Sequence, residues 1–351
     1  MFIFNFFIKI DYVTINQISN FGHQAFMLAE NLFISKVTTL FSHTIESQET
    51  VHIAFCFDDN YAMPAGIAMS SVMINNSDKN LVFHLFANSV SDEKIQKFHQ
   101  LSEKNTTIIC YEVSDEFSIN PDTLVLHVSA STCLRFVVPQ MLNKITSRVL
   151  YLDCDILCTN NLNHLINTDL SDKYAAVVPD VEKTQEKQCS ACDIPYGEYF
   201  NAGMIYINTD MWVDNNLTEK AFAMINSGKV YKFADQDVLN ILMQGKTQFL
   251  PKIFNQLTSL TVGGKEDSVL SDDTVIIHYV TGNKPWYQLY LTPLYQRYIA
   301  ASPWANRKLL LANENAPSTT RRYAKLLASK HQYFKAFKYY FLYLKHKVFK
   351  K

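Results

Sequence analysis

Apolar runs of strand length alternate with helical patterns along the first part of the chain. Residues 51–57 form an apolar run, and residues 63–74 then place apolar side chains at helical spacing. Strand, helix and strand patterns follow at 81–87, 91–104 and 106–113. This order predicts a doubly wound α/β domain, in which ligands bind beyond the carboxyl ends of the strands.

The same kinds of pattern continue into the second half of the chain and suggest its domain organisation. The expected strands are 148–152, 174–179, 199–208 and 275–278, and the expected helices are 217–225 and 236–243. Residues 1–50 are poorly patterned and end in a polar stretch, so we expect an N-terminal extension there. The main domain is expected at 51–290, followed by a helical C-terminal region at 291–351.

The C-terminal region carries a helical stripe of apolar residues with lysines beside it. The stripe comprises Phe334, Phe337, Phe341, Leu344 and Val348, at spacings of three and four. All 33 acidic residues precede residue 315, whereas residues 321–351 hold ten of the 32 lysines and arginines. A basic amphipathic helix is typical of binding to an anionic membrane surface. The alternatives are docking of the stripe on the main domain and binding of nucleic acid, which the acidic body would disfavour.

The chain has seven cysteines, and no run of residues is long and apolar enough to cross a bilayer. An odd number of scattered cysteines fits reduced thiols in the cytosol. Cys189 and Cys192 have the spacing of a redox or zinc pair, but no second pair accompanies them, so we interpret them as structural. The first ten residues lack the basic start and cleavage site of a signal peptide. We therefore expect a cytoplasmic protein.

Asp153, Cys154 and Asp155 follow the predicted strand at 148–152. On an extended strand, side chains at i and i+2 point to the same side, so the two carboxylates are expected to lie together. Such ligands suit Mg²⁺ or Mn²⁺, which keep positions free for substrate phosphates. The competing interpretation is a strand end with two solvated acids. Because the chain has neither a G-x-G-x-x-G motif nor a P-loop, a metal would have to anchor any nucleotide phosphates.

Six short motifs occur in order between residues 57 and 286. They are FDDNY at 57–61, a Ser129 and Arg135 pair, LYLDCDIL at 150–157, YFNAGMIYIN at 199–208, DQDVLN at 235–240 and HYVTGNKPW at 278–286. With these motifs the chain resembles glycosyltransferase family 8, and most closely the bacterial lipopolysaccharide core hexosyltransferases. An ordered set of motifs is far more specific than any one of them.

The resemblance implies a GT-A fold, a Rossmann-like mixed sheet flanked by helices, in a catalytic domain at 51–290. It also implies a UDP-glucose or UDP-galactose donor and a Mn²⁺ or Mg²⁺ ion held by Asp153, Asp155 and His278. The imidazole favours Mn²⁺ over Mg²⁺, because nitrogen ligands suit the later metals. Taken alone, His278 would be interpreted as a hydrogen-bonded histidine at a strand end.

The family's contacts to the nucleotide match Asp58, Asn60 and Tyr61, with the tyrosine ring lying against the uracil. Without the resemblance, these residues form an N-cap and a turn before a helix, and both roles are compatible. Lys284 matches a lysine that contacts the diphosphate and would stabilise the departing UDP. Its alternative role is that of a surface lysine.

The family's contacts to the donor sugar match six residues, most of them polar residues at the ends of predicted elements. These are Arg135, Asp180, Asn201, Ala202, Asp235 and Gln236. The implied reaction transfers a hexose with retention, which forms an α-linkage. Gln236 matches the amide that faces the anomeric carbon, and amides are poor nucleophiles. We therefore favour attack from the face that UDP leaves, with a covalent intermediate on Asp180 or Asp235 as the alternative.

The implied acceptor is a saccharide of the lipopolysaccharide core, reached from the cytoplasmic face of the inner membrane through the basic tail. Two other functions stay open. One is transfer to a soluble or protein-linked saccharide. The other is non-catalytic saccharide binding, which is less favoured because all three metal-ligand positions carry suitable residues. The last motif departs from the family, because Thr281 stands where a glycine is usual and the glycine follows at Gly282.

Overall fold

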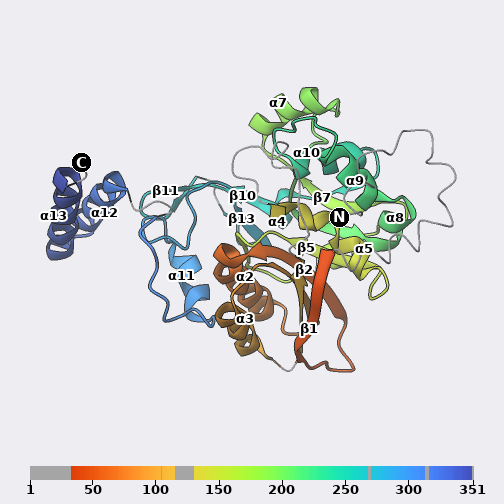
Figure 1. Cartoon of the computed structure of the whole chain (residues 1–351), viewed down its shortest axis with the longest axis horizontal. Helices are drawn as coiled ribbons and strands as arrows, with labels where there is room; N and C mark the ends of the chain where they lie inside the picture. The colour runs from red at the N-terminus through yellow and green to blue at the C-terminus, as the bar shows by residue number, and fades with distance from the viewer. Residues whose placement is uncertain (1–32, 104, 115–129, 268–269, 313–315, 350–351) are drawn as a thin grey trace, which may run out of the picture.

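The computed structural model describes residues 33–103, 105–114, 130–267, 270–312 and 316–349 (Figure 1). Ser129 of the second motif and the first 32 residues of the predicted N-terminal extension therefore lie outside the described residues.

A mixed sheet of eight strands forms the centre of the molecule, in the order β1-β4-β3-β2-β5-β8-β7-β9. Neighbours from β4 to β5 are parallel, whereas β8 runs antiparallel to β5 and β7, and β1 runs antiparallel to β4. The strands are β1 Ile34–Ser42, β2 Thr50–Asp58, β3 Asn80–Asn88, β4 Thr106–Val113, β5 Arg148–Leu152, β7 Ala175–Pro179, β8 Phe200–Asn208 and β9 Thr247–Phe249. The doubly wound pattern predicted from the sequence is confirmed in the parallel part, from β2 to β4.

β1 joins part of the predicted N-terminal extension to this sheet. Residues 34–42 pair with β4, with Ile34 opposite Val113, and form one edge of the sheet. Residues 43–49 then connect β1 to β2. The described part of the extension is thus an edge strand and its connection rather than a separate unit.

Alternation along β2 separates two hydrophobic cores, one on each face of the sheet. Ile53, Phe55 and Phe57 pack into one core, whereas Ala54 packs into the other. The first core includes side chains of the helices Ala62–Asn75, Asp92–Phe98 and Pro293–Ala300, and the second includes side chains of the helices Val138–Leu142, Thr209–Asp214, Leu217–Ile225 and Asp235–Leu242. The sheet is therefore covered by helices on both faces, as Figure 1 shows.

The helices predicted at 63–74, 217–225 and 236–243 are confirmed, whereas the one predicted at 91–104 is shorter, ending at Phe98 before a 3-10 turn, η3 His99–Leu101. The helices between residues 130 and 214 were not predicted from the sequence. The helices of the body are α2 Ala62–Asn75, α3 Asp92–Phe98, α4 Ala130–Cys133, α5 Val138–Leu142, α6 Asn163–Ile166, α7 Glu182–Cys192, α8 Thr209–Asp214, α9 Leu217–Ile225, α10 Asp235–Leu242 and α11 Pro293–Ala300. In the described part of the chain, three further 3-10 turns are η2 Asp59–Tyr61, η5 Leu134–Phe136 and η6 Lys252–Asn255.

A smaller sheet of three strands, in the order β10-β13-β6, lies beyond the end of β5. Its strands are β6 Ile156–Cys158, β10 Gln256–Thr258 and β13 Ile276–Tyr279. β13 is antiparallel to β6 and parallel to β10. This sheet brings segments more than 100 residues apart in the sequence against the end of the main sheet. A short hairpin, β11 Leu260–Thr261 and β12 Lys265–Glu266, follows β10.

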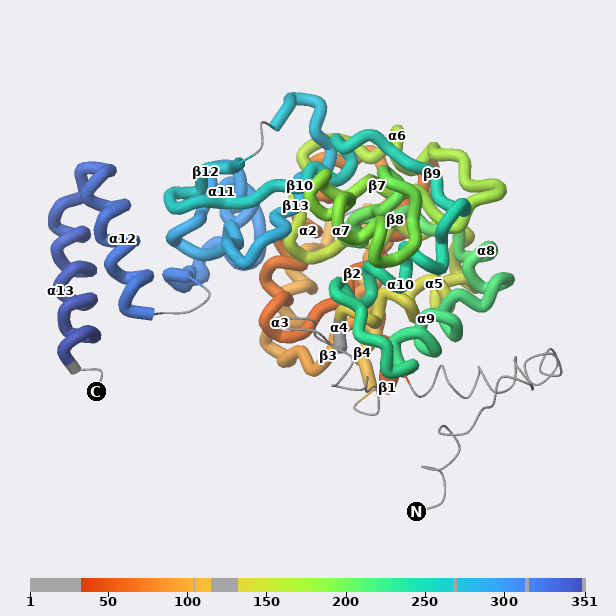
Figure 2. The backbone as a smooth tube through the Cα atoms, turned by 90° about the horizontal axis from the view of Figure 1, so that it is seen from above, coloured from red at the N-terminus to blue at the C-terminus, as the bar shows by residue number. Residues whose placement is uncertain are grey.

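The predicted C-terminal region divides into two parts. α11 packs into the body, where it buries Tyr295 and Ile299. α12 Pro317–Ser329 and α13 Tyr333–Phe349 pack on each other beside the body, as Figures 1 and 2 show. The rings of Tyr323 on α12 and Tyr339 on α13 meet edge to face, with centroids 4.8 Å apart. Among the described helices, none is long and apolar enough to span a membrane.

Candidate active site

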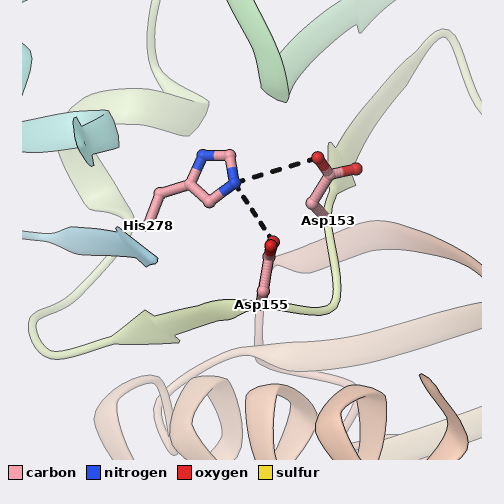
Figure 3. A group of neighbouring side chains, drawn as sticks. All are labelled: Asp153, Asp155 and His278. Carbon is pink, nitrogen blue, oxygen red and sulfur yellow. Dashed lines mark ion pairs between the residues drawn. The ribbon is translucent and has the colours of Figure 1, made fainter. Parts of the chain in front are cut away.

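Asp153 and Asp155 lie in the turn that joins β5 to β6. The prediction that both stand on an extended strand is wrong, because β5 ends at Leu152, but their predicted proximity is confirmed. β6 returns beside β13 with Ile156 opposite His278, which places Asp155 next to the histidine. Nε2 of His278 lies 3.1 Å from Oδ1 of Asp155 and 3.9 Å from Oδ2 of Asp153 (Figure 3).

These three side chains form a cluster that fits a divalent cation. One ligand atom from each lies within 4.8 Å of the others. Oδ1 of Asp155 is buried and accepts no hydrogen bond from the described residues, although Nε2 of His278 lies 3.1 Å away. A buried carboxylate oxygen without a partner is costly unless a cation completes its surroundings. Two carboxylate oxygens and one imidazole nitrogen form a donor set that suits Mn²⁺.

His278 is buried and is positioned by residues from two other elements. Its Nδ1 lies 3.1 Å from Oδ1 of Asn255, the last residue of η6. On β8, a Cβ at Gly203 would lie only 2.1 Å from Cε1 of His278. The glycine at 203 is therefore required for space, and its carbonyl also accepts a 2.8 Å hydrogen bond from the backbone N–H of Asp153.

Lys284 reaches the cluster from the loop after β13 and is almost fully buried. Its Nζ donates to Oδ2 of Asp155 at 2.6 Å and to the carbonyl of Tyr279 at 2.5 Å. Burial acts to raise the pKa of Asp155, but Lys284 and His278 outweigh it and hold that pKa well below its usual range. The alternative of a surface lysine is thus excluded, and Asp155 is kept ionised for a cation.

Arg135, on η5, is buried and contacts two acidic side chains of the site, Asp153 and Asp235. Its Nη2 donates to Oδ1 of Asp153 at 2.9 Å, and its Nε lies 3.0 Å from Oδ2 of Asp235. The guanidinium also covers the ring of Tyr151, 4.8 Å from the centroid. Burial nevertheless raises the pKa of Asp235 to about 6, although Arg135 acts to lower it.

Asp180, Asn201 and Gln236 meet at the ends of β7, β8 and the start of α10. Nε2 of Gln236 donates to Oδ2 of Asp180 at 3.0 Å, and Oε1 of Gln236 accepts from the backbone N–H of Ala202 at 3.0 Å. Asn201 lies 3.3 Å from both Asp180 and Gln236. The pairing of β7 with β8 shifts register here, between Val177 and Val178. The six predicted donor-sugar residues thus fall into two groups of contacting residues, one around Arg135 and the other around Gln236.

Asp58, Asn60 and Tyr61 lie at the carboxyl end of β2, beside the end of β5. Oδ1 of Asp58 accepts from the backbone N–H of Asn60 at 2.9 Å and of Tyr61 at 3.2 Å, so the predicted capping role is confirmed. The Tyr61 ring meets Trp286 edge to face, 5.7 Å between centroids, and stays partly exposed. An aromatic surface is therefore present at the strand end where the nucleotide was predicted.

The sequence analysis missed residues that hydrogen-bond to the site residues and help to position them. Oδ1 of Asp237 accepts from the hydroxyl of Tyr199 at 2.5 Å and from Gln188 at 2.9 Å, and Tyr199 in turn accepts from Gln236. Asp237 stands in the DQDVLN motif and could have been found there. Asn255 stands between motifs, and no signal in the sequence marks it.

The backbone before α10 is strained where it enters the site. Ala234 has φ +40° and ψ −108°, a conformation that is unfavourable for alanine. The two residues that follow are Asp235 and Gln236. Strain of this kind persists only where the surrounding structure enforces it, and it is concentrated at functional sites.

Two family models match the chain. The model described as glycosyl transferase family 8 matches residues 52–289, and the model described as glycosyl transferase family 8 C-terminal matches residues 291–347. Together they extend from β2 to α13.

Characterised relatives cover most of the chain. The chain is 34% identical to lipopolysaccharide 1,2-glucosyltransferase of Escherichia coli strain K12, over 74% of this chain and 80% of that protein. It is 32% identical to lipopolysaccharide 1,3-galactosyltransferase of Salmonella typhimurium strain LT2, over 85% of this chain and 91% of that protein. A structure of galactosyltransferase LgtC with donor and acceptor sugar analogues is also similar, with a TM-score of 0.59 and 25% identity over 72% of this chain and 95% of LgtC.

Proposed function

This chain belongs to glycosyltransferase family 8, and we propose that it transfers glucose or galactose from a UDP-sugar to a saccharide of the lipopolysaccharide core. Its relatives make it a hexosyltransferase, and the predicted GT-A fold and family are confirmed. The observation that carries the proposal is the Asp153, Asp155 and His278 cluster at the end of the sheet, with Lys284 beside it. This arrangement supports binding of a cation together with a diphosphate.

The residues around the cluster suit the departure of UDP. When bound, a cation held by Asp153, Asp155 and His278 would neutralise charge on the diphosphate. Lys284 adds a second positive charge, which would stabilise the leaving group after the bond to the sugar breaks. The hydroxyl of Thr281 is buried and has no hydrogen-bond partner among the described residues, so it is available to donate where the family has a glycine.

The positions of the carboxylates favour a front-face mechanism with retention over a covalent intermediate. Asp235 is buried, and its Oδ2 is engaged by Nε of Arg135, so this carboxylate is not free to attack the sugar. Oδ2 of Asp180 is engaged by the amide of Gln236, and its Oδ1 accepts from the backbone N–H of Val181. Gln236, whose carbonyl oxygen is held near Ala202, is then the group that stabilises the oxocarbenium-like state.

We also propose that α13 binds the membrane surface peripherally at the cytoplasmic face of the inner membrane. Ala336, Tyr339, Tyr343 and His346 form the less exposed side of α13, and the stripe lies on the opposite side of the helix. Phe334 and Phe337, two stripe residues, are 97% and 74% exposed. The stripe therefore does not dock on the body in this structure, and an apolar face beside lysines suits an anionic bilayer.

A transfer assay tests the proposal and separates the donors and acceptors. Radiolabelled UDP-glucose and UDP-galactose would be offered with Mn²⁺ on truncated lipopolysaccharides and on free oligosaccharides. We expect transfer of one of the two sugars to the lipopolysaccharide, and loss of transfer after EDTA that Mn²⁺ restores. Transfer only to free oligosaccharides would favour the alternative of a soluble acceptor. Full activity of Asp155→Asn after EDTA treatment would contradict the metal site.

A further inference from the structure

The amide groups beside the metal cluster form a chain whose donors and acceptors can be assigned. The backbone N–H of Gly203 donates to the side chain of Asn201 at 3.0 Å. A backbone N–H can only donate, so the atom of Asn201 that faces it is the oxygen Oδ1. The amide of Asn255 lies 3.0 Å from the same oxygen, so the atom of Asn255 that faces Asn201 is the donor Nδ2.

This assignment decides which nitrogen of His278 carries the hydrogen. With Nδ2 of Asn255 directed to Asn201, Oδ1 of Asn255 faces Nδ1 of His278 at 3.1 Å. An amide oxygen only accepts, so Nδ1 must be the donor. In the neutral ring Nε2 then has a free lone pair, and Nε2 is the atom that faces Asp153 and Asp155.

We propose that Asn255 is a positioning residue that keeps His278 in the tautomer able to bind a divalent cation through Nε2. It does so by accepting from Nδ1, and its second contact, to Asn201, fixes its own orientation. Asn255 is 1% exposed, so water cannot readily replace it. Asn201 also lies 3.3 Å from Oε1 of Gln236, and the chain of contacts therefore links the metal ligand to the donor-sugar residues. The inference rests on the metal site proposed above.

Binding of Mn²⁺ in the presence of UDP, measured by electron paramagnetic resonance of the free ion, tests this role. Asn255→Leu removes both contacts at similar volume, and we expect Mn²⁺ to bind about 10–100-fold more weakly. Asn255→Asp keeps an acceptor for Nδ1, so its Mn²⁺ affinity should stay within about threefold of wild type or increase. Its transfer rate should still fall, because a carboxylate oxygen would oppose Oδ1 of Asn201.

Asn208→Leu is the matched control. Asn208 is also buried, and its amide caps α8 and donates to the carbonyl of Leu170, away from the cluster. This variant should lose stability but keep wild-type Mn²⁺ affinity. Folding of each variant is checked by circular dichroism.

The outcomes separate the two proposals. A wild-type protein that binds no Mn²⁺ with UDP overturns the metal site itself. Wild-type affinity in folded Asn255→Leu, or lost affinity in Asn255→Asp, overturns only the role of Asn255. Nitrogen-15 spectra of the histidine rings test the tautomer without metal, and the signal that is absent in His278→Gln is assigned to His278. This signal should show a hydrogen on Nδ1. A hydrogen on Nε2 alone would contradict the inference.

Discussion

At the scale of single residues, the position of His278 depends on the absence of a side chain at Gly203. A Cβ at 203 would lie 2.1 Å from Cε1 and 2.6 Å from Nδ1 of His278, and 3.0 Å from Oδ2 of Asp153. His278 has little room to withdraw, because it is buried on β13 and contacts Asn255. At Gly282, in the last motif, a Cβ would meet no atom within 4 Å. Of these two glycines, only Gly203 is needed for space.

Gly203→Ala should therefore displace His278 and lower the transfer rate by about 100-fold, the usual effect of misplacing a reacting group by about 1 Å. Gly282→Ala is the matched control and should keep activity within about twofold of wild type, because it creates no contact. Both are measured as kcat and KM in the transfer assay. Equal activity of the two variants would show that the histidine can move without cost.

At the scale of elements, three strands of the main sheet share a buried polar chain away from the metal cluster. Nε2 of His84 on β3 lies 3.0 Å from Nδ1 of His52 on β2, and Nδ1 of His84 lies 3.0 Å from the hydroxyl of Tyr111 on β4. Burial, and in lesser part His52, lowers the pKa of His84 to about 3. The parallel strands thus require His84 to stay neutral.

This requirement predicts a loss of stability in acid. In the unfolded chain His84 has a pKa of about 6.5 and binds a proton below that pH, whereas in the folded chain it stays neutral. The contribution of His84 to the unfolding free energy is therefore fully present above pH 6.5 and declines below it. We expect His84 to account for about 2 kcal/mol of lost unfolding free energy between pH 6.5 and 4.5. Urea unfolding at both values should show a smaller loss in His84→Gln.

The exposed His164→Gln serves as the control and should lose as much as wild type over the same interval. If His84→Gln shows the same pH dependence as this control, His84 is protonated in the folded sheet, and the assignment of a neutral chain is wrong.

At the scale of the whole molecule, basic and exposed apolar residues are concentrated on α12 and α13. All acidic residues precede these two helices in the sequence. On the side of α13 away from the stripe, α12 and α13 form a hollow lined by Ser318, Arg321, Arg322, Lys325 and Tyr343. Guanidinium and ammonium groups of this kind suit anionic lipid headgroups. The proposed membrane contact would therefore use the apolar face of α13, with the basic hollow as a separate surface.

Combined substitution of Phe334, Phe337 and Phe341 by serine should weaken binding to anionic vesicles at least about tenfold, because exposed aromatic area no longer enters the bilayer. Thermal stability should hardly change, since these side chains are exposed in the folded chain. Cosedimentation with vesicles measures the binding.

The matched control replaces three exposed apolar residues of the body by serine, namely Val37, Ile74 and Ile145. This variant should sediment with vesicles as wild type does. If the phenylalanine variant binds vesicles as strongly as wild type, the stripe does not contact the membrane. The binding would then be due to the basic residues.

The sequence by itself determined many of the helices and strands and indicated which residues form the candidate site. The apolar run at 51–57 and the helical period in 63–74 reflect local geometry, so they predicted β2 and α2 to within a few residues. The ordered motifs likewise predicted that Asp153, Asp155 and His278 belong to one site, and the structure confirms that these side chains lie together.

Only the tertiary structure decided how these groups meet. The pairing of β6 with β13 brings Asp155 to His278, and η6 brings Asn255 behind it, across more than 20 residues that carry no motif. The need for glycine at 203 and the outward direction of the α13 stripe depend in the same way on what packs beside them. Contacts between distant segments leave no periodic trace in a sequence, because local patterns record the face of an element and not its partner.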